Sequence, residues 1–219
     1  ISRNINKIKK KLNNKNGKLY YISGDVGKRE DCEKIVKYSK KTLGDIDLWI
    51  NNAGTCSYKK RNSIEFKDQE IEEIVNTNLL GTMYCSNKML KEMNSQPQGG
   101  IIVNVEGAGS NGTATPTYSI YGSTKCAITQ FTKSLKKENT NNKIKIVTLS
   151  PGIMNTEMLT SGETEISPYV LPILKAFCEE PEIVAKNVVP KLKMGKDVSY
   201  LSFPKIIKLL LHTPIKNIL

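Results

Sequence analysis

Short apolar runs alternate with longer helical patterns along this chain of 219 residues. The strand-length runs lie at 19–22, 46–50, 101–105 and 144–149, and the longer helical patterns lie at 29–43 and about 66–93. The run at 101–105 is almost continuously hydrophobic, as parallel strands buried on both faces are. This alternation is typical of βαβ units. It predicts an α/β fold with a doubly wound parallel sheet.

Polar and Gly-rich motifs follow the predicted strands. They are Asp25, the segment Asn51-Asn52-Ala53-Gly54, the segment after Asn104, and Pro151-Gly152. In open α/β sheets, ligands bind beyond the carboxyl ends of the strands. The sequence therefore predicts that these motifs converge on one crevice. The alternative is that each motif is a simple turn.

Tyr121 and Lys125 stand four residues apart in a segment predicted to be helical. This spacing places both side chains on one face of a helix. An ammonium beside a phenol favours the phenolate, so we expect a lowered pKa for Tyr121. Such a phenol can exchange a proton with a carbonyl or alcohol oxygen. The alternative is a solvated surface pair.

The net charge of +12 invites a nucleic-acid or anionic-membrane interpretation. Arginine, however, occurs only at Arg3, Arg29 and Arg61, so nearly all of the positive charge is lysine. Asparagine is also abundant, and a joint excess of lysine and asparagine is what an A/T-biased coding sequence gives. A surface poor in arginine lacks the bidentate groups preferred for phosphate and base recognition. We therefore expect no nucleic-acid partner.

The cysteine and histidine content excludes several classes of site. The five cysteines are widely spaced, no C-x-x-C occurs, and His212 is the only histidine. A zinc site or a Ser-His-Asp triad is therefore not expected, and we predict no metal and reduced, mostly buried thiols. No apolar run approaches the roughly 20 residues that span a membrane. Because the chain opens with Ile1, we expect the natural start and any targeting peptide to lie upstream.

Five motifs together resemble the short-chain dehydrogenase/reductase family, from its second strand to its C-terminus. They are Asp25-Val26, Asn51-Asn52-Ala53-Gly54, Asn78 within 78–81, Tyr121-Gly122-Ser123-Thr124-Lys125, and Pro151-Gly152 with Thr156. The resemblance implies a single Rossmann-like domain over 1–219. It also implies that this domain is N-terminally truncated, lacking the family's first strand and its Gly-rich phosphate loop.

The same resemblance implies an NAD(P)-dependent oxidoreductase with assignable catalytic roles. Tyr121 would be the acid in reduction and the base in oxidation. Lys125 would lower the pKa of Tyr121 and hold the nicotinamide ribose. Asn78 would anchor a water that relays protons towards Lys125. The hydride chemistry would belong to the cofactor.

Further residues are implied as cofactor contacts. Asp25 and Val26 would meet the adenine, Asn52, Ala53 and Gly54 would line the cleft, Pro151 and Gly152 would border it, and Thr156 would bind the carboxamide. Arg3 would meet a ribose 2′-phosphate, which favours NADP(H) over NAD(H). The alternative for Arg3 is an ordinary surface arginine.

The family serine normally lies about a dozen residues before the tyrosine, and no serine occupies that place here. The segment reads Asn104-Val105-Glu106-Gly107-Ala108-Gly109-Ser110, in which Ser110 is the nearest substitute. Ser110 could donate a hydrogen bond to a developing oxyanion if the turn bends towards Tyr121. The alternative is a plain loop serine.

That departure, with other segments, resembles the chlorophyll(ide) b reductase branch of the family. The segments are 47–55, 106–110, 115–116, 121–126, 150–152, and the tail at 180–191, 199–201 and Pro204. Resemblance to this branch implies NADPH-dependent reduction of a formyl group and a location in a plastid. If the resemblance to this branch does not hold, we expect a cytoplasmic location. The Lys/Asn-rich composition is unlike a typical land-plant member. The alternatives are a reductase of another lipid-like carbonyl (isoprenoid, steroid or oxoacyl) and a non-catalytic scaffold.

The C-terminal third is expected to serve the substrate. Residues 157–180 would form a mobile cap over a small hydrophobic carbonyl substrate, and ordinary core packing is the alternative. The segment 204–212 has an apolar face between lysines, so it could lie on an anionic membrane surface. Core docking or a subunit contact is the alternative, and we expect a homo-oligomer.

Overall fold

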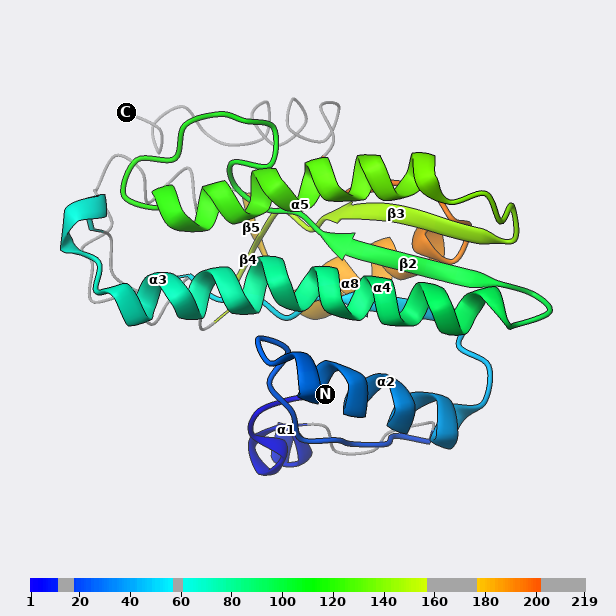
Figure 1. The fold of residues 1–219 in the computed structure, drawn as a ribbon. Helices are drawn as coiled ribbons and strands as arrows, with labels where there is room; N and C mark the ends of the chain where they lie inside the picture. The colour runs from blue at the N-terminus through cyan, green and yellow to red at the C-terminus, as the bar shows by residue number, and fades with distance from the viewer. Residues whose placement is uncertain (12–17, 57–60, 157–176, 202–219) are drawn as a thin grey trace.

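A computed structural model describes residues 1–11, 18–56, 61–156 and 177–201. Its centre is a sheet of parallel strands in the order β1-β2-β3-β6. These strands are β1 (Leu48–Asn51), β2 (Gly100–Val105), β3 (Ile144–Ser150) and β6 (Val198–Ser199). Figure 1 shows the two longest strands of the sheet, β2 and β3, side by side. Two short strands, β4 (Ile153–Met154) and β5 (Cys178–Glu179), pair separately, also in parallel. The predicted parallel α/β sheet is confirmed.

Helices connect and cover these strands. They are α1 (Ile5–Lys11), α2 (Arg29–Leu43), the 3-10 turn η1 (Ser63–Glu65), α3 (Asp68–Val75), the π-helical turn η2 (Asn76–Leu80), α4 (Gly81–Asn94), α5 (Ser119–Glu138) and α8 (Pro181–Leu192). Helix α2 follows the charge preference of the helix dipole, with acidic residues in its first turn and lysines in its last. It stops at Gly44, whose φ of 76° is readily reached only by glycine.

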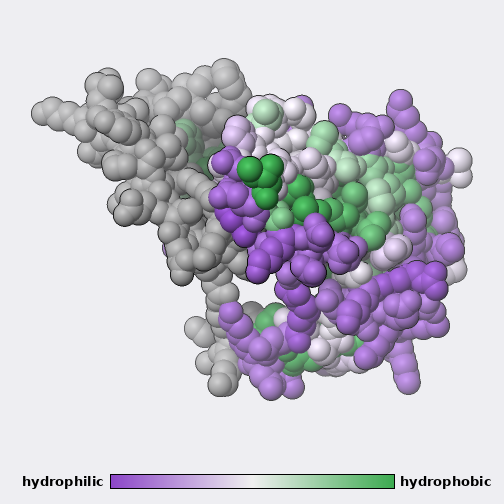
Figure 2. Space-filling view, turned by 60° about the vertical axis from the view of Figure 1, so that its left-hand side comes forward, coloured by the Kyte–Doolittle hydropathy of each residue, from purple (hydrophilic) through white to green (hydrophobic). Residues whose placement is uncertain are grey.

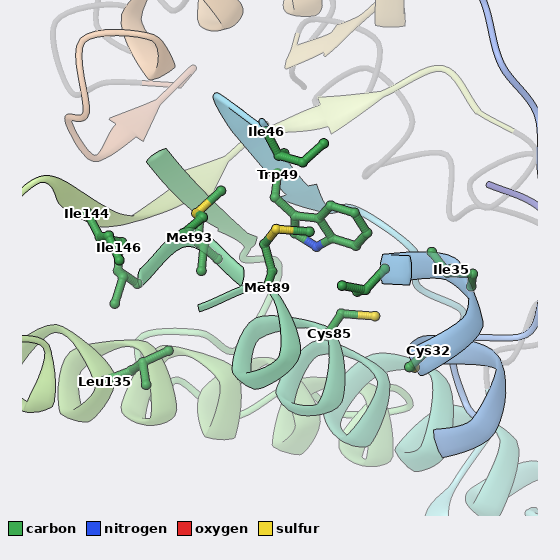
Figure 3. Packing of buried hydrophobic residues seen from close by; sticks show 12 residues of the cluster. Cys32, Ile35, Ile46, Trp49, Cys85, Met89, Met93, Leu135, Ile144 and Ile146 are labelled. Atoms are coloured by element: carbon green, nitrogen blue, oxygen red, sulfur yellow. The ribbon is translucent and has the colours of Figure 1, made fainter. Parts of the chain in front are cut away.

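Side chains alternate across the two faces of β2 and β3. Ile102, Ile144 and Ile146 pack with residues of α2, α4 and α5, as Figure 3 shows around Trp49 and Met89. Val103 and Val147 point to the other face, where they pack with Val184, Val188 and Leu192 of α8. Successive side chains of a strand point to opposite faces of the sheet, and here the side chains on both faces are buried. This is the pattern of a sheet covered by helices on each side. The doubly wound arrangement is therefore confirmed.

The predicted helix at about 66–93 is broken into three pieces. Helix α3 and helix α4 are joined by the π-helical turn η2. A π-helical turn carries one extra residue in the helix and is frequent at functional sites. It turns the side chain of Asn78 into the protein, where this residue is completely buried.

The predicted strand at 19–22 is wrong. Only an isolated parallel bridge between Ser2 and Ser23 forms there, and Leu19 and Tyr20 are about half exposed. A strand needs a neighbouring ladder for its N–H and C=O groups. Within the described residues the Ser2 N–H donates to the Ile22 carbonyl at 3.3 Å, but no strand lies beside 19–22, and β1 has no described neighbour on the side away from β2.

The cysteines and the surface have the character expected from the sequence. The five cysteines all lie among the described residues and form no disulfide there, and Cys32, Cys56 and Cys85 are buried. On the face shown in Figure 2, hydrophilic residues make up much of the described surface, with a hydrophobic band between them. Among the described residues, no helix could span a membrane and no cluster of three metal-ligating side chains occurs.

The expected substrate cap at 157–180 lies almost entirely outside the described residues, and the segment 204–212 lies wholly outside them.

Candidate active site

A groove of about 240 Å³ runs along the open edge of β1 at its carboxyl end. Its walls include Val26, Asn51, Asn52, Ala53, Thr77 and Gly81. Two of the motifs predicted to converge, those after residues 24 and 50, therefore do meet in one hollow. The groove runs alongside β1, past Trp49 and Ile50, and reaches the loop that follows this strand, where open α/β sheets bind their ligands.

The wall of this groove is built by a close approach of two backbones. A Cβ on Gly81 would lie 2.9 Å from both the Val26 Cγ2 and the Val26 carbonyl oxygen, so only glycine lets α4 approach this turn. The turn itself is fixed by Asp25, whose Oδ1 accepts the Gly27 N–H at 2.9 Å. The Asp25 N–H in turn donates to the Asp31 carboxylate at 2.9 Å. Val26 lines the groove, whereas Asp25 braces the turn beneath it.

Lys125 is buried, with 5% of its surface exposed. Its Nζ donates a hydrogen bond to the Val105 carbonyl oxygen at 2.9 Å and lies 5.6 Å from the centre of the Tyr121 ring. The predicted juxtaposition on one face of α5 is therefore present, and the alternative of a solvated surface pair is wrong.

Tyr121 lies in the first turn of α5, and its hydroxyl reaches the backbone of Gly107. A Cβ at position 107 would overlap the Tyr121 hydroxyl. Glycine at this position is therefore what lets the phenol lie beside the end of β2. Sequence reasoning did not single out Gly107, because a glycine in a Gly-rich turn carries no signal of which side chain it admits.

The expected lowering of the Tyr121 pKa is wrong. Burial raises the pKa of Tyr121 to about 12, with a smaller contribution from Cys56. Burial also lowers the pKa of Lys125 to about 8, against a smaller raising effect of Glu106. Both groups lose hydration, which disfavours their charged forms, and this effect outweighs the attraction between them. At neutral pH, Tyr121 is a neutral phenol and most of Lys125 is charged.

Asn78 joins three segments through its side chain. Its Oδ1 accepts the Thr55 N–H at 2.8 Å, and its Nδ2 donates to the Thr55 carbonyl at 2.9 Å and to Thr124 Oγ1 at 3.1 Å. Its backbone carbonyl accepts from Thr82 Oγ1 at 2.7 Å. The side chain thus ties the loop after β1 to α5. The relay of protons through a water stays a prediction.

Gly54 separates Asn78 from Lys125. A Cβ at position 54 would lie 3.5 Å from Asn78 Oδ1 and 3.8 Å from Lys125 Nζ. The absence of a side chain here leaves open the space between the loop Asn52-Ala53-Gly54 and the Lys125 ammonium. The predicted cleft residues and the predicted catalytic residues are therefore neighbours.

Ser110 is held inside the Gly-rich turn. Its Oγ accepts the Gly107 N–H at 2.9 Å and donates to the Lys125 carbonyl at 3.5 Å. The hydroxyl therefore ties the turn that bears Gly107 to the helix that bears Tyr121. Its role as an oxyanion donor stays a prediction.

The remaining predicted residues lie away from the groove. The Arg3 guanidinium forms an ion pair with Glu73 at 3.0 Å and is more than half exposed. Pro151 and Gly152 follow β3, and Gly152 has a φ of 76° and packs against Leu201. The Thr156 hydroxyl lies 3.5 Å from the Met154 carbonyl oxygen. None of these residues is part of the groove wall.

Thr124 is a further residue of the site. It is buried, accepts from Asn78, and donates from its Oγ1 to the Tyr121 carbonyl at 2.7 Å. It stands within the motif that drew attention to Tyr121. Its position three residues after Tyr121 and one before Lys125 was a signal that it shares their helix.

The comparisons with known proteins agree with this geometry. The family model for short chain dehydrogenases matches residues 1–166. The chain is 41% identical over 194 residues to the probable chlorophyll(ide) b reductase NYC1, chloroplastic, of Oryza sativa subsp. japonica, covering 87% of this chain and 38% of that protein. It is 38% identical over 172 residues to the chlorophyll(ide) b reductase NOL, chloroplastic, of Arabidopsis thaliana, covering 77% and 49%. The chain thus spans two fifths to half of these relatives.

A solved structure, ElxO with NADP bound, is similar in shape and sequence. It has a TM-score of 0.68 and 28% identity, with 82% of this chain and 75% of that chain covered. The match over residues 1–166, the parallel sheet and the Tyr121–Lys125 pair agree with one another. The chain belongs to the short chain dehydrogenase family.

Proposed function

We propose that this chain is the catalytic part of an NADPH-dependent reductase that converts an aldehyde or ketone of a hydrophobic substrate to an alcohol. The observation that carries the proposal is the pair of Tyr121 and Lys125 on one face of α5, with the buried Lys125 ammonium next to Gly54 in the loop whose Asn52 and Ala53 line the groove. A non-catalytic scaffold has no use for a lysine buried at an energetic cost.

The loop Asn52-Ala53-Gly54 together with Lys125 fits the ribose end of a nicotinamide cofactor. Gly54 leaves free space beside Lys125 Nζ, and Asn52 and Ala53 are exposed in the groove. Lys125 would hold the ribose, and Asn52 and Ala53 would flank it. The bound cofactor would supply the hydride.

The phenol of Tyr121 is suited to the reductive direction. Because its pKa is about 12, Tyr121 holds its proton at neutral pH and can donate it to the carbonyl oxygen as that oxygen gains negative charge. The Lys125 ammonium then stabilises the phenolate that remains. The O–H bond of Tyr121 breaks, the O–H bond of the alcohol forms, and the phenolate takes its next proton from solvent.

The substrate class and location extend the proposal. Two relatives that this chain resembles are named as chloroplastic chlorophyll(ide) b reductases. The pattern Glu106-Gly107-Ala108-Gly109-Ser110 agrees with that resemblance. We therefore propose a chlorophyll(ide) b-type formyl group as substrate and a plastid as location. NADPH is proposed over NADH because ElxO, a similar structure, was solved with NADP.

The test uses the full-length protein with NADPH or NADH and a panel of carbonyls that contains chlorophyllide b, isoprenoid aldehydes, steroid ketones and oxoacyl thioesters. We expect oxidation of NADPH with the pigment and formation of its hydroxymethyl product. Tyr121→Phe should lower kcat by about 10³-fold or more and leave NADPH binding intact. Full activity of Tyr121→Phe would overturn the mechanism, and turnover of another carbonyl alone would reassign the substrate.

A further inference from the structure

A chain of buried polar side chains runs across the sheet behind the active site. It begins at Trp49 of β1, whose Nε1 donates to Asn51 Oδ1 at 2.8 Å. Asn51 Nδ2 donates to Asn104 Oδ1 at 2.8 Å and to Ser86 Oγ of α4 at 2.9 Å. Asn104 Nδ2 donates to Thr132 Oγ1 of α5 at 2.9 Å. These side chains are 9% exposed or less, so water does not replace any of these bonds.

Each hydrogen bond in this network has a fixed donor and a fixed acceptor. Thr132 Oγ1 donates its only hydrogen to the Ile128 carbonyl at 2.7 Å, so towards Asn104 it can only accept. Asn104 must therefore turn its amide nitrogen to α5 and its oxygen to β1 and α4. Ser86 Oγ confirms this orientation, because it donates to Asn104 Oδ1 at 3.2 Å. One arrangement satisfies every member.

This hydrogen-bond network ends at Thr132, which lies on the same face of α5 as Tyr121 and Lys125. Thr132 follows Lys125 by seven residues, which is two helical turns, and Tyr121 precedes Lys125 by one turn. Strand β2 therefore holds this face at two points, Asn104 to Thr132 and the Val105 carbonyl to Lys125 Nζ. A rotation of α5 about its axis would break both contacts. It would also move the Tyr121 hydroxyl away from the backbone of Gly107.

We propose that Thr132 and Asn104 are positioning residues that fix the rotation of α5, and with it the place of the Tyr121 hydroxyl and the Lys125 ammonium. The inference rests on the proposed reductase function. It adds two residues that touch neither substrate nor cofactor. Their effect on the reaction is transmitted through the helix.

The test compares three substitutions in the full-length protein. Thr132→Val keeps the shape of the side chain but leaves Asn104 Nδ2 without an acceptor, whereas Thr132→Ser keeps the acceptor. Ser86→Ala is the matched control, because it removes bonds of the same network on the α4 side and leaves the contact with α5. We expect Thr132→Val to lower kcat by about 10- to 100-fold, with KM for NADPH little changed. Thr132→Ser should retain most of the activity, and Ser86→Ala should lose stability but not kcat.

A second readout does not depend on turnover. The buried Lys125, which Glu106 and Tyr121 face, should add a rising contribution to the free energy of unfolding between pH 8 and 10.5, since over that range its side chain binds more protons in the unfolded state. The raised pKa values of Cys56, Cys85 and Tyr121 act in the opposite direction, so the readout is the difference between each variant and the wild type. Thr132→Val should shrink this rise by exposing Lys125, and Ser86→Ala should preserve it. Equal losses of kcat in Thr132→Val and Ser86→Ala, or an unchanged rise in Thr132→Val, would overturn the inference.

These outcomes separate the two proposals. If the wild-type protein reduces no carbonyl, the proposed function fails, while the pH dependence of unfolding still tests the position of α5. Should Thr132→Val fail to fold, Thr132→Ala removes the same acceptor with a smaller side chain and carries the same comparison.

Discussion

At the residue scale, the environment of Tyr121 depends on what its neighbours lack. Gly107 has no Cβ, and its backbone therefore lies against the Tyr121 hydroxyl. Gly54 likewise leaves space beside Lys125 Nζ. Burial then sets the protonation of both groups, so that the phenol is neutral and the ammonium is held at a cost.

Gly107→Ala should displace the Tyr121 hydroxyl. The added Cβ would occupy its position, and the phenol would have to turn away from the site. We expect kcat of the full-length protein to fall about 100-fold while the affinity for NADPH, measured by fluorescence titration, stays the same. Asn111→Ala, an exposed change on the same loop, is the control. Wild-type kcat in Gly107→Ala would show that the hydroxyl acts from another position.

Lys125→Met should make the protein inactive but more stable. Lowering the pKa of a lysine from 10.5 to about 8 corresponds to about 3 kcal/mol of destabilisation at pH 7. The lost hydrogen bond to the Val105 carbonyl offsets about 1 kcal/mol of the gain. Urea unfolding at pH 7 should therefore show a gain of about 2 kcal/mol. A loss of stability would mean that Lys125 is not desolvated.

At the scale of elements, the π-helical turn η2 joins the loop after β1 to the catalytic helix. Asn78 lies in this turn, is buried, and bonds to Thr55 and to Thr124 of α5. Thr124 Oγ1 in turn donates a hydrogen bond to the Tyr121 carbonyl. Together with the contacts of Asn104 with Thr132 and of Lys125 with the Val105 carbonyl, this link holds α5 on two sides between Tyr121 and Thr132.

Asn78→Ala should weaken this junction. It removes three side-chain hydrogen bonds and leaves the buried Thr55 N–H and carbonyl without their partner. We expect a loss of about 3 kcal/mol in the free energy of unfolding, measured by urea titration. Exchange of the Thr55 amide hydrogen should accelerate, whereas Ser95→Ala at the exposed end of α4 should leave it unchanged. An unaltered exchange rate would contradict the link.

At the scale of the whole molecule, the sheet brings the site together at the edge where β1 is open. The groove, the loop 52–54 and the start of α5 all lie at the carboxyl ends of β1 and β2. Cores on both faces of the sheet hold this edge in place. Because this packing buries Tyr121 and Lys125, the protonation states of these two side chains depend on the fold of the whole domain.

The reductive rate of the full-length protein should fall above pH 8. Lys125 loses its charge as pH rises through its pKa of about 8, while Tyr121 keeps its proton up to a pKa of about 12. We expect log kcat to be level from pH 6 to 8 and then to fall by about one unit per pH unit. Stopped-flow measurement of NADPH oxidation would check this profile. A rate that rises through pH 8 to 10 would show that Lys125 acts in its neutral form.

The sequence by itself determined the alternation of helices and parallel strands from α2 to β3 and the pairing of Tyr121 with Lys125. These features depend on hydrophobic period and on spacing along a helix, which are local. Asn52, Ala53 and Gly54 were also found from sequence, because motifs at parallel strand ends meet at one edge.

Only the tertiary structure decided the rest. The segment 19–22 has the composition of a strand, but no described strand lies beside it to pair with its backbone. The pKa of Tyr121 is raised because burial removes water, and burial depends on residues distant in the sequence. The contact of the Tyr121 hydroxyl with Gly107 and the hydrogen bond between Asn104 and Thr132 also join elements that are separate in the sequence. Ladder pairing, desolvation and packing are set by neighbours in space, which spacing along the chain does not specify.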